Sequence, residues 1–239
     1  MKRPLIILAG PTAVGKTALS VRLAKRINAE IISADSMQVY RYMDIGSAKI
    51  RPEEMDGVPH HLVDVLDPKE DFNVVRFQQM AKDAAREIWA KGRIPLVVGG
   101  TGFYIQALLY DIDFTENDGD IVYRQELEKI AREKGGEYLH TLLEAVDPQA
   151  STTIHPNNIK RMIRALEFHR QTGGKISEHN EKERAKESPY NYAYFVLTDE
   201  RGRLYERIDK RADLMLGEGL EDEVRFLREQ GVKRGATAM

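Results

Sequence analysis

The sequence predicts an α/β protein, in which a parallel sheet is flanked by helices and one helical domain is inserted into the chain. Between Pro4 and Val98, short apolar runs alternate with segments that carry apolar residues at helical spacing. That alternation is typical of βαβ units and therefore of a parallel sheet. After Asp111 helix-like segments follow one another, and a strand-like run returns only at Tyr192–Leu197. The core is thus expected to resume after an insertion.

The first part of the chain is expected to supply most of the sheet. Apolar runs predict strands over Pro4–Ala9, Glu30–Ala34 and Pro95–Val98, with His60–Asp67 as a candidate further strand. A helix is expected directly after Gly15, where large apolar residues recur every four positions, and another over Val74–Ala90.

The second part contains the predicted insertion. Helix-like segments cover Val122–Val146 and Asn158–Gln171, after a polar stretch at Thr115–Asp120 that includes the acidic run Glu116–Asp120. The mostly charged stretch Gly173–Pro189 predicts a mobile or solvated connection. After the strand at Tyr192–Leu197, a long helix is expected over Arg203–Gln230, broken or bent near Gly217 and Gly219. We therefore expect a core from residues 1–115 and 190–239, and a helical domain from residues 116–189.

Composition excludes several classes of protein. The chain has 239 residues, of which 42% are hydrophobic and 31% charged, enough to bury a sizeable core. It has no cysteine, which excludes disulfide scaffolds, cysteine-ligated zinc and thiol nucleophiles. The longest apolar stretch, Leu5–Ala9, is too short to cross a bilayer, and no signal peptide is evident. A cytoplasmic protein is expected, and the net charge of −2 leaves nucleic-acid binding open.

One motif predicts phosphate binding. Between the first strand and the first helix the chain has the pattern Gly-x₄-Gly-Lys-Thr, formed by Gly10, Pro11, Thr12, Ala13, Val14, Gly15, Lys16 and Thr17. In such a P-loop, backbone N–H groups surround phosphate oxygens, the lysine adds positive charge and the threonine hydroxyl binds Mg²⁺. The motif therefore predicts a P-loop NTPase/kinase-like fold and a bound di- or triphosphate with Mg²⁺.

Polar residues follow two other predicted strands. Asp35 ends the strand over Glu30–Ala34 and could be a metal-associated carboxylate, a general base or a helix N-cap. Gln38 could hydrogen-bond a ligand or complete a capping box. Thr101, after Gly99 and Gly100, could face the same crevice or cap a helix.

The two adjacent histidines, His60 and His61, do not predict zinc, because neighbouring residues on a strand point to opposite faces.

Two groups of basic residues could bind phosphates. Lys160, Arg161 and Arg164 lie beside an apolar stripe on a predicted helix, where they form either a phosphodiester-binding edge or a solvated face. Arginines at positions 203, 207 and 211 recur every four residues. They could neutralise a diphosphate or pair with acidic neighbours such as Glu206 and Asp209.

Taken together, these motifs resemble those of a known family, the tRNA dimethylallyltransferases, also called tRNA isopentenyltransferases. The matching stretches cover nearly the whole chain. They are GPTAVGKT (Gly10–Thr17), SADSMQVYRYMDIGSAK (Ser33–Lys49), VPHHLVD (Val58–Asp64), VVGGTGFYIQAL (Val97–Leu108), IHPNNIKRMIRALE (Ile154–Glu167) and LYERIDKRADLML (Leu204–Leu216).

The resemblance implies transfer of a dimethylallyl group from dimethylallyl diphosphate to N6 of the adenosine just 3′ of the anticodon in tRNA, with release of diphosphate. It implies that the P-loop holds the departing diphosphate, with Arg203 or Arg207 near it. It also implies catalytic roles for Asp35 as general base, for Thr101 in the reaction channel and for Lys16, and it makes Thr17 the Mg²⁺ ligand. The tRNA-binding residues that it implies are Asp35, Ser36, Met37, Gln38, Thr101, Arg124, Ile159, Lys160, Arg161, Met162 and Ile163.

The partners expected are therefore the anticodon loop of tRNA and dimethylallyl diphosphate, with no membrane and with the protein as a monomer. The chain ends before a further family segment of the QAIGYKE type, so part of the tRNA contact surface is expected to be missing. Three other functions are weighed against this one. They are an adenylate isopentenyltransferase that modifies free AMP, ADP or ATP, a small-molecule P-loop kinase, and a nonenzymatic nucleotide switch or RNA-binding module.

Overall fold

The computed structural model describes residues 2–114 and 120–233. These residues form two compact units, one drawn from Met1–Ile112 and Ser188–Met239 (unit 1) and the other from Asp113–Glu187 (unit 2). The stretch 115–119, which holds most of the acidic run noted in the sequence, lies outside the described residues. In the described part of the chain, no helix is both long enough and apolar enough to cross a membrane.

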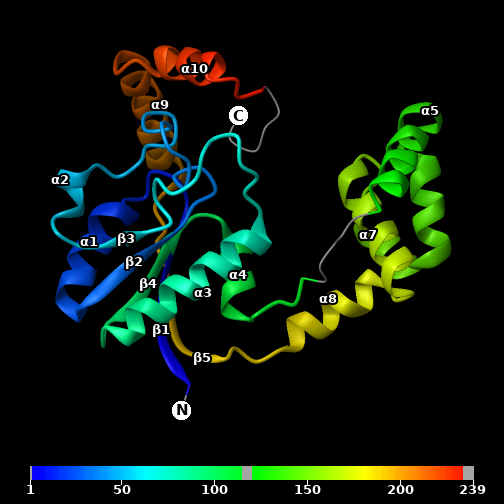
Figure 1. Cartoon of the computed structure of the whole chain (residues 1–239), viewed down its shortest axis with the longest axis horizontal. Coiled ribbons are helices and arrows are strands. Elements are labelled where there is room, and N and C mark those ends of the chain that lie inside the picture. The colour runs from blue at the N-terminus through cyan, green and yellow to red at the C-terminus, as the bar shows by residue number, and fades with distance from the viewer. Residues whose placement is uncertain (1, 115–119, 234–239) are drawn as a thin grey trace. The chain divides into compact units, whose positions relative to one another are not determined.

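Unit 1 is built on a parallel sheet, and its described strands are arranged in the order β3-β2-β4-β1-β5 (Figure 1). The strands are β1 (Arg3–Ala9), β2 (Ala29–Ala34), β3 (His60–His61), β4 (Ile94–Gly99) and β5 (Tyr190–Val196). The helices of this unit are α1 (Lys16–Ile27), α2 (Pro52–Met55), α3 (Val74–Ala90), α4 (Gly102–Leu109), α9 (Arg201–Gly217) and α10 (Leu220–Glu229). The sheet therefore joins segments that are far apart in the sequence, with β1 between β4 and β5.

Alternating side chains of the strands form a core on each face of the sheet. Ile7, Ile32 and Val97 belong to the core that includes α3 and α4, whereas Leu8 and Ile31 belong to the core that includes α1. This alternation follows from the pleat of a strand, which directs successive side chains to opposite faces. Both faces of the sheet are covered by helices. A ligand can therefore bind at the carboxyl ends of the strands, where polar residues follow them.

Gly99 brings the carboxyl ends of β2 and β4 unusually close together. A Cβ atom at this position would lie 2.1 Å from the carbonyl oxygen of Ala34, which no side chain tolerates. The N–H of Thr101 also donates a hydrogen bond to this carbonyl oxygen of Ala34, at 3.4 Å. Glycine at position 99 thus allows the turns after these two strands to meet.

Unit 2 is helical, and its described helices are α5 (Ile121–Val146), α6 (Pro148–Thr153), α7 (Ile159–Thr172) and α8 (Ile176–Ala185). Gly135 interrupts α5 with a φ of 83°, so α5 consists of two helical arms joined by a kink. The arms and α7 enclose a core of their own, in which Leu139, Leu143 and Met162 are fully buried.

Most expected elements are present, and two differ from the expectation. The strand expected over His60–Asp67 ends at His61, because Leu62 and Asp64 both adopt a positive φ of 62°. The stretch Gly173–Pro189, expected as a mobile or solvated connection, contains the helix α8, and most residues of this helix are exposed. This helix is tied to the rest of unit 2, since the buried Glu183 accepts a hydrogen bond of 2.8 Å from the N–H of Asp113.

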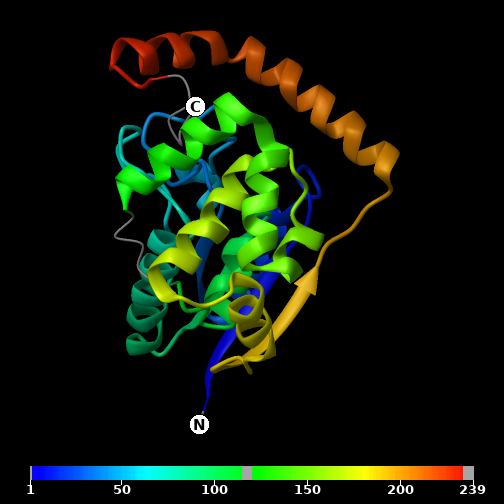
Figure 2. The ribbon, with the colours of Figure 1, turned by 90° about the vertical axis from the view of Figure 1, so that its right-hand side faces the viewer.

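The helix expected over Arg203–Gln230 is divided as anticipated. α9 ends at Gly217, Gly219 adopts a φ of 102°, and α10 begins at Leu220. Figure 2 shows β5 leading into α9, and α10 continuing from α9 after a bend.

Candidate active site at the carboxyl edge of the sheet

The P-loop connects β1 to α1 and presents backbone N–H groups at the start of that helix. Gly15 is the N-cap residue with a left-handed φ of 91°, and Ala13 is also left-handed with a φ of 63°. A left-handed alanine costs about 1 kcal/mol, and strain of this kind is typical of ligand-binding loops. Because glycine has no side chain to cap the helix, the first N–H groups of α1 are available to an anion.

Lys16 is the first residue of α1, and its ammonium group is held over the P-loop. Its Nζ donates hydrogen bonds to the carbonyl oxygens of Gly10 at 2.8 Å and Pro11 at 2.7 Å. Burial lowers the pKa of Lys16, the carboxylate of Asp35 opposes this change, and the charge of Arg211 adds to it. A half-buried ammonium group in this position is well suited to a phosphate oxygen.

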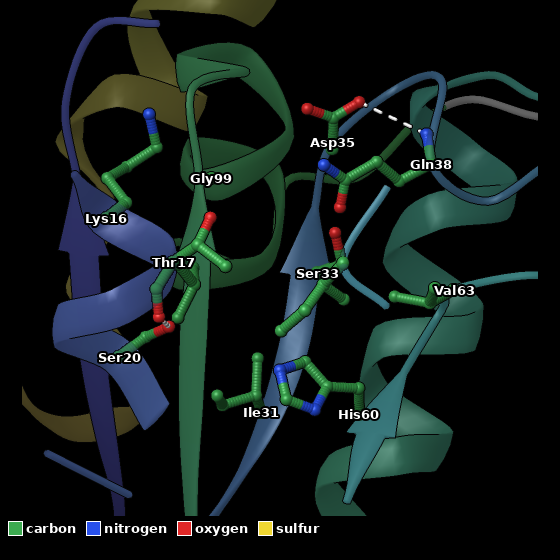
Figure 3. Close-up of a pocket in the computed structure, with 12 residues that line it drawn as sticks. Lys16, Thr17, Ser20, Ile31, Ser33, Asp35, Gln38, His60, Val63 and Gly99 are labelled. Atoms are coloured by element: carbon green, nitrogen blue, oxygen red, sulfur yellow. Dashed lines mark hydrogen bonds between the residues drawn. The ribbon is translucent and has the colours of Figure 1, made fainter. Parts of the chain in front are cut away.

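A single pocket connects the P-loop with the ends of β2 and β4 (Figure 3). In Figure 3, the side chains of Lys16 and Asp35 lie at the same end of the pocket, on either side of Gly99. Ile31 of β2 and His60 of β3 lie beside each other at the opposite, lower end of this view. Among the described residues, the lining consists of Lys16, Thr17, Ser20, Ile31, Ser33, Asp35, Gln38, Ile50, His60, Val63, Val98 and Gly99.

Asp35 is fixed by backbone donors from the turn that follows it. Its Oδ1 accepts hydrogen bonds from the N–H groups of Met37 at 2.8 Å and Gln38 at 3.3 Å. The segment after Asp35 is a turn and not a helix, so the interpretations of Asp35 as a helix N-cap and of Gln38 as part of a capping box are wrong. The second oxygen of Asp35 points over the pocket, away from this turn (Figure 3).

Gln38, Ser36 and Met37 follow Asp35 in the same turn. The side-chain amide of Gln38 donates to the carbonyl oxygens of Ser47 at 3.4 Å and Ala48 at 3.2 Å, and Gln38 lines the pocket. Met37 packs against the core of unit 1, and Ser36 is half-buried. Within this turn, Asp35 and Gln38 are therefore the side chains that face the pocket.

The backbone of Thr101 lies close to that of Asp35, because the N–H of Thr101 contacts the carbonyl oxygen of Ala34, the residue before Asp35. It is the N-cap residue of α4, but its side chain makes no capping hydrogen bond. The hydroxyl group is thus not committed to the helix end, which leaves it for another partner.

Arg207, and not Arg203, reaches the P-loop. Its guanidinium donates to the carbonyl oxygen of Ala13 at 3.3 Å and pairs with Asp199 at 2.8 Å. Arg203 pairs with Glu200 at 3.5 Å and lies 3.9 Å from Asp199. Both arginines thus pair with acidic neighbours, which was one of the two alternatives, but the partners are Asp199 and Glu200 before α9 and not Glu206 or Asp209.

Asp199 orients Arg207, and sequence reasoning missed it. It lies three residues after the end of β5, in the connection that leads to α9, whereas Asp35 follows β2 directly. An acidic residue in the connection that follows a strand at the carboxyl edge of the sheet is the signal that could have identified it.

The two histidines of β3 point to opposite faces of the sheet. His60 lines the pocket, where burial lowers its pKa, and its Nδ1 lies 2.8 Å from the carbonyl oxygen of Val58. His61 contacts the buried carboxylate of Glu30 at 2.7 Å. The sequence did not place His60 in the pocket, because the position of the two-residue strand β3 in the sheet could not be inferred from it.

Unit 2 carries the other residues implied by the resemblance. Lys160 and Arg161 are exposed in the first turn of α7, whereas the side chains of Met162 and Ile163 are buried in the core of the unit. Ile159 is partly buried against that core. Any contact of Met162 or Ile163 with RNA thus cannot use a freely exposed side chain.

Arg124 is held by an acidic partner within unit 2. Its guanidinium forms two parallel hydrogen bonds with the buried carboxylate of Glu167, at 2.7 and 2.9 Å. This hydrogen bonding raises the pKa of Arg124. A pair of this geometry fixes the orientation of the guanidinium, whose side chain is still 47% exposed and can meet an anion.

Two family models match the sequence. The model described as IPP transferase matches residues 38–239, and the model described as isopentenyl transferase matches residues 3–65. A tRNA dimethylallyltransferase from Lachnoclostridium phytofermentans is 62% identical over 99% of this chain and 76% of its own length. The chain belongs to the tRNA dimethylallyltransferase family.

Solved structures of other family members have the same fold. The tRNA isopentenylpyrophosphate transferase of Bacillus halodurans matches with a TM-score of 0.69 and 47% identity, covering 100% of this chain and 73% of that one. A eukaryotic dimethylallyltransferase acting on tRNA matches with a TM-score of 0.82 and 31% identity, covering 95% of this chain and 56% of that one. The P-loop of this chain is therefore that of a prenyltransferase family, and the kinase interpretation is excluded.

Proposed function

We propose that this chain transfers a dimethylallyl group from dimethylallyl diphosphate to N6 of the adenosine immediately 3′ of a tRNA anticodon. The observation that carries this proposal is the single pocket with Lys16 and Thr17 on one side and Asp35 on the other. Such a pocket suits a reaction in which a diphosphate leaves while a base removes a proton from the attacking group. The names of the relatives support tRNA as the acceptor.

The P-loop side of the pocket stabilises the leaving group. When the bond between the allylic carbon and the diphosphate oxygen breaks, the bonding electrons remain on that oxygen. Lys16, the N–H groups at the start of α1 and the guanidinium of Arg207 surround the place where this charge develops. Because these groups are already oriented, they stabilise the transition state without reorganisation.

The Asp35 side of the pocket activates the acceptor. The exocyclic nitrogen N6 forms a new bond to the allylic carbon, and its proton passes to the oxygen of Asp35 that points over the pocket. Gln38 lines the pocket together with this carboxylate, and the N–H of Thr101 contacts the carbonyl of Ala34, which precedes Asp35. In this proposal, both residues hold the base of the nucleotide. An adenosine in an anticodon loop can leave its stack at lower cost than a base in a duplex.

The pocket is also suited to Mg²⁺. Magnesium prefers oxygen ligands and commonly uses one or two protein groups together with phosphate oxygens. The hydroxyl of Thr17 lines the pocket at the start of α1, and Ser33 and Asp35 add oxygen atoms to the same lining. When bound there by Thr17 and the diphosphate, Mg²⁺ would neutralise negative charge on the leaving group.

Unit 2 supplies positive charge for the tRNA backbone in this proposal. Lys160 and Arg161 are exposed at the start of α7, where the helix dipole also favours a phosphate. Contacts of this kind position a nucleic acid without reading its sequence. Cytoplasmic location and a monomeric state stay predictions.

The proposal is tested by a transfer assay with labelled dimethylallyl diphosphate and Mg²⁺. The chain is incubated with tRNA, with AMP, with neither, and with a tRNA in which the adenosine 3′ of the anticodon is replaced by guanosine. We expect label only in the unaltered tRNA. Label in AMP but not in tRNA would identify an adenylate isopentenyltransferase instead, and label in the guanosine variant would refute the assigned position.

A further inference from the structure

A carboxylate from α10 is bound by three consecutive backbone N–H groups of the loop before α2. Glu223 Oε2 accepts hydrogen bonds from Asp44 and Ile45, both at 2.7 Å, and its Oε1 accepts one from Gly46 at 2.9 Å. Successive N–H groups that converge on one anion form a nest, which is a strong binding arrangement for a carboxylate. Glu223 thus satisfies three backbone donors that belong to a segment distant in sequence.

The packing around this contact is close. A Cβ atom at Gly46 would lie 3.1 Å from Leu220 and 3.3 Å from the carboxylate of Glu223, so the loop approaches α10 with little space to spare. The rings of Tyr42 and Phe226 also meet edge to face, with centroids 5.7 Å apart. These contacts fix α10 against the loop in one register.

The same loop also holds Gln38. The N–H of Ala48 donates to the carbonyl of Ile45, which closes a turn directly after the nest. The carbonyl oxygens of Ser47 and Ala48 then accept the side-chain amide of Gln38, whose own N–H donates to Asp35. A continuous set of hydrogen bonds therefore runs from Glu223 through the loop to the pocket.

We propose that Glu223 is a positioning residue that sets the orientation of Gln38, and through it the Asp35 side of the pocket. This inference rests on the proposed function, because it concerns the acceptor half of that reaction. α9, which precedes α10, carries Arg207 to the P-loop. The α9–α10 pair thus holds both halves of the pocket, the leaving-group side through Arg207 and the acceptor side through Glu223.

The loop has a second anchor, so its fold does not depend on Glu223. The buried ammonium of Lys49 donates to the carbonyl of Tyr40 at 2.7 Å and to the carboxylates of Asp44 and Asp64 at 2.6 Å each. Removal of the negative charge at position 223 should therefore loosen the nest and leave the rest of unit 1 folded.

The experiment compares Glu223→Gln with Glu221→Gln in the 239-residue chain. Both residues lie in the first turn of α10, so both substitutions remove one negative charge from the same helix end. In Glu223→Gln an NH₂ group replaces one acceptor oxygen and faces the N–H donors. Hydrogen–deuterium exchange of segment 43–48 is measured together with transfer to tRNA.

For Glu223→Gln we expect faster exchange in this segment and a fall in kcat of about tenfold or more, since small misplacements of reacting groups cost this much. The KM for dimethylallyl diphosphate should stay within about twofold, because that substrate binds the P-loop side. Glu221→Gln should match the parent chain in exchange and in transfer.

A double substitution tests whether Glu223 acts through Gln38. If it does, Glu223→Gln combined with Gln38→Ala transfers no more slowly than Gln38→Ala alone, because coupled residues are not additive. Multiplicative losses, unchanged exchange in Glu223→Gln, or a kcat equal to that of Glu221→Gln would each overturn the inference. Absence of transfer by the parent chain would overturn the proposed function instead, while the exchange comparison still reports on the nest.

Discussion

Replacement of Asp35 by asparagine separates the proposed base from its structural role. Asparagine keeps the Oδ1 acceptor that binds the N–H groups of Met37 and Gln38, and it changes only the oxygen that points over the pocket. The turn should therefore keep its shape, while the group that removes the proton from N6 is lost.

The expected loss can be estimated from the role assigned to Asp35. A positioned general base contributes about 10²–10⁴ in rate, which corresponds to roughly 3–5 kcal/mol in the activation barrier. The Asp35→Asn chain should lose that much in kcat, and its melting temperature and affinity for tRNA should stay close to those of the parent. Asp35→Ala should lose stability as well, by about 1 kcal/mol for each hydrogen bond removed.

The assay is single-turnover transfer of labelled dimethylallyl to saturating tRNA, with thermal unfolding measured in parallel. Asp67→Asn is the matched control, since the Oδ1 of Asp67 also accepts a backbone N–H, that of Lys69 at 2.9 Å, away from the pocket. It should affect neither rate nor stability. If Asp35→Asn transferred within about threefold of the parent rate, a difference too small for a lost general base, the assignment of Asp35 as the base would be wrong.

Three further predictions follow from the site and its support. Arg207→Ala should raise the KM for dimethylallyl diphosphate about tenfold, as expected for a lost charge-assisted contact, whereas the matched change Arg203→Ala should have little effect; equal effects in steady-state kinetics would contradict the assignment of Arg207. Lys16→Met should abolish transfer, and the free energy of unfolding of the parent chain, measured relative to this variant, should rise as the pH rises toward 10.5. The reason is that the lowered pKa of Lys16 makes its charged form a cost to the folded state, and this cost is relieved as the folded protein loses the proton; in urea unfolding, a parent stability that fell relative to the variant over this pH range would refute the reasoning. Glu30→Gln should destabilise the chain at neutral pH by about 3 kcal/mol, because it removes the buried carboxylate that pairs with His61, Lys91 and Arg93. Burial would raise the pKa of Glu30, but hydrogen bonds from His61 and Lys91 lower it overall. The contribution of Glu30 to the free energy of unfolding is therefore present above pH 4.5 and is lost as the pH falls through the folded-state pKa. A stability difference between variant and parent that persisted unchanged in acid would argue against this account.

Much of the fold could be predicted because local sequence patterns decide it. The run Pro4–Ala9, the Gly-Lys-Thr turn and the helical spacing of Val74–Ala90 each carry their signal within a few residues. The P-loop is the clearest case, since its glycines, lysine and threonine are adjacent in sequence and need only a strand and a helix around them. Asp35 and Thr101 could also be placed at the sheet edge, because Asp35 directly follows an apolar run and Thr101 follows another after Gly99 and Gly100.

The sequence alone could not decide which partner each polar residue selects. Asp35 could have capped a helix, and only the turn after β2 shows that it does not. Arg203 and Arg207 lie one helical turn apart and look equivalent in sequence, but the position of Asp199 after β5 directs Arg207 to Ala13. The helix α8 was missed because its contacts, such as that of Glu183 with Asp113, come from residues far along the chain.

The sequence by itself determined the class of fold and the phosphate loop, because each depends on neighbours within one or two turns of chain, whereas the candidate catalytic residues were proposed from the resemblance of its motifs to a known family. Only the tertiary structure decided that Lys16, Asp35 and His60 share one pocket, that Arg207 is the arginine at the P-loop, and that Glu223 supports the loop beside Gln38. The physical reason is that these contacts join distant segments through the order of the strands and the turn between α9 and α10. No local pattern in a single sequence encodes that order.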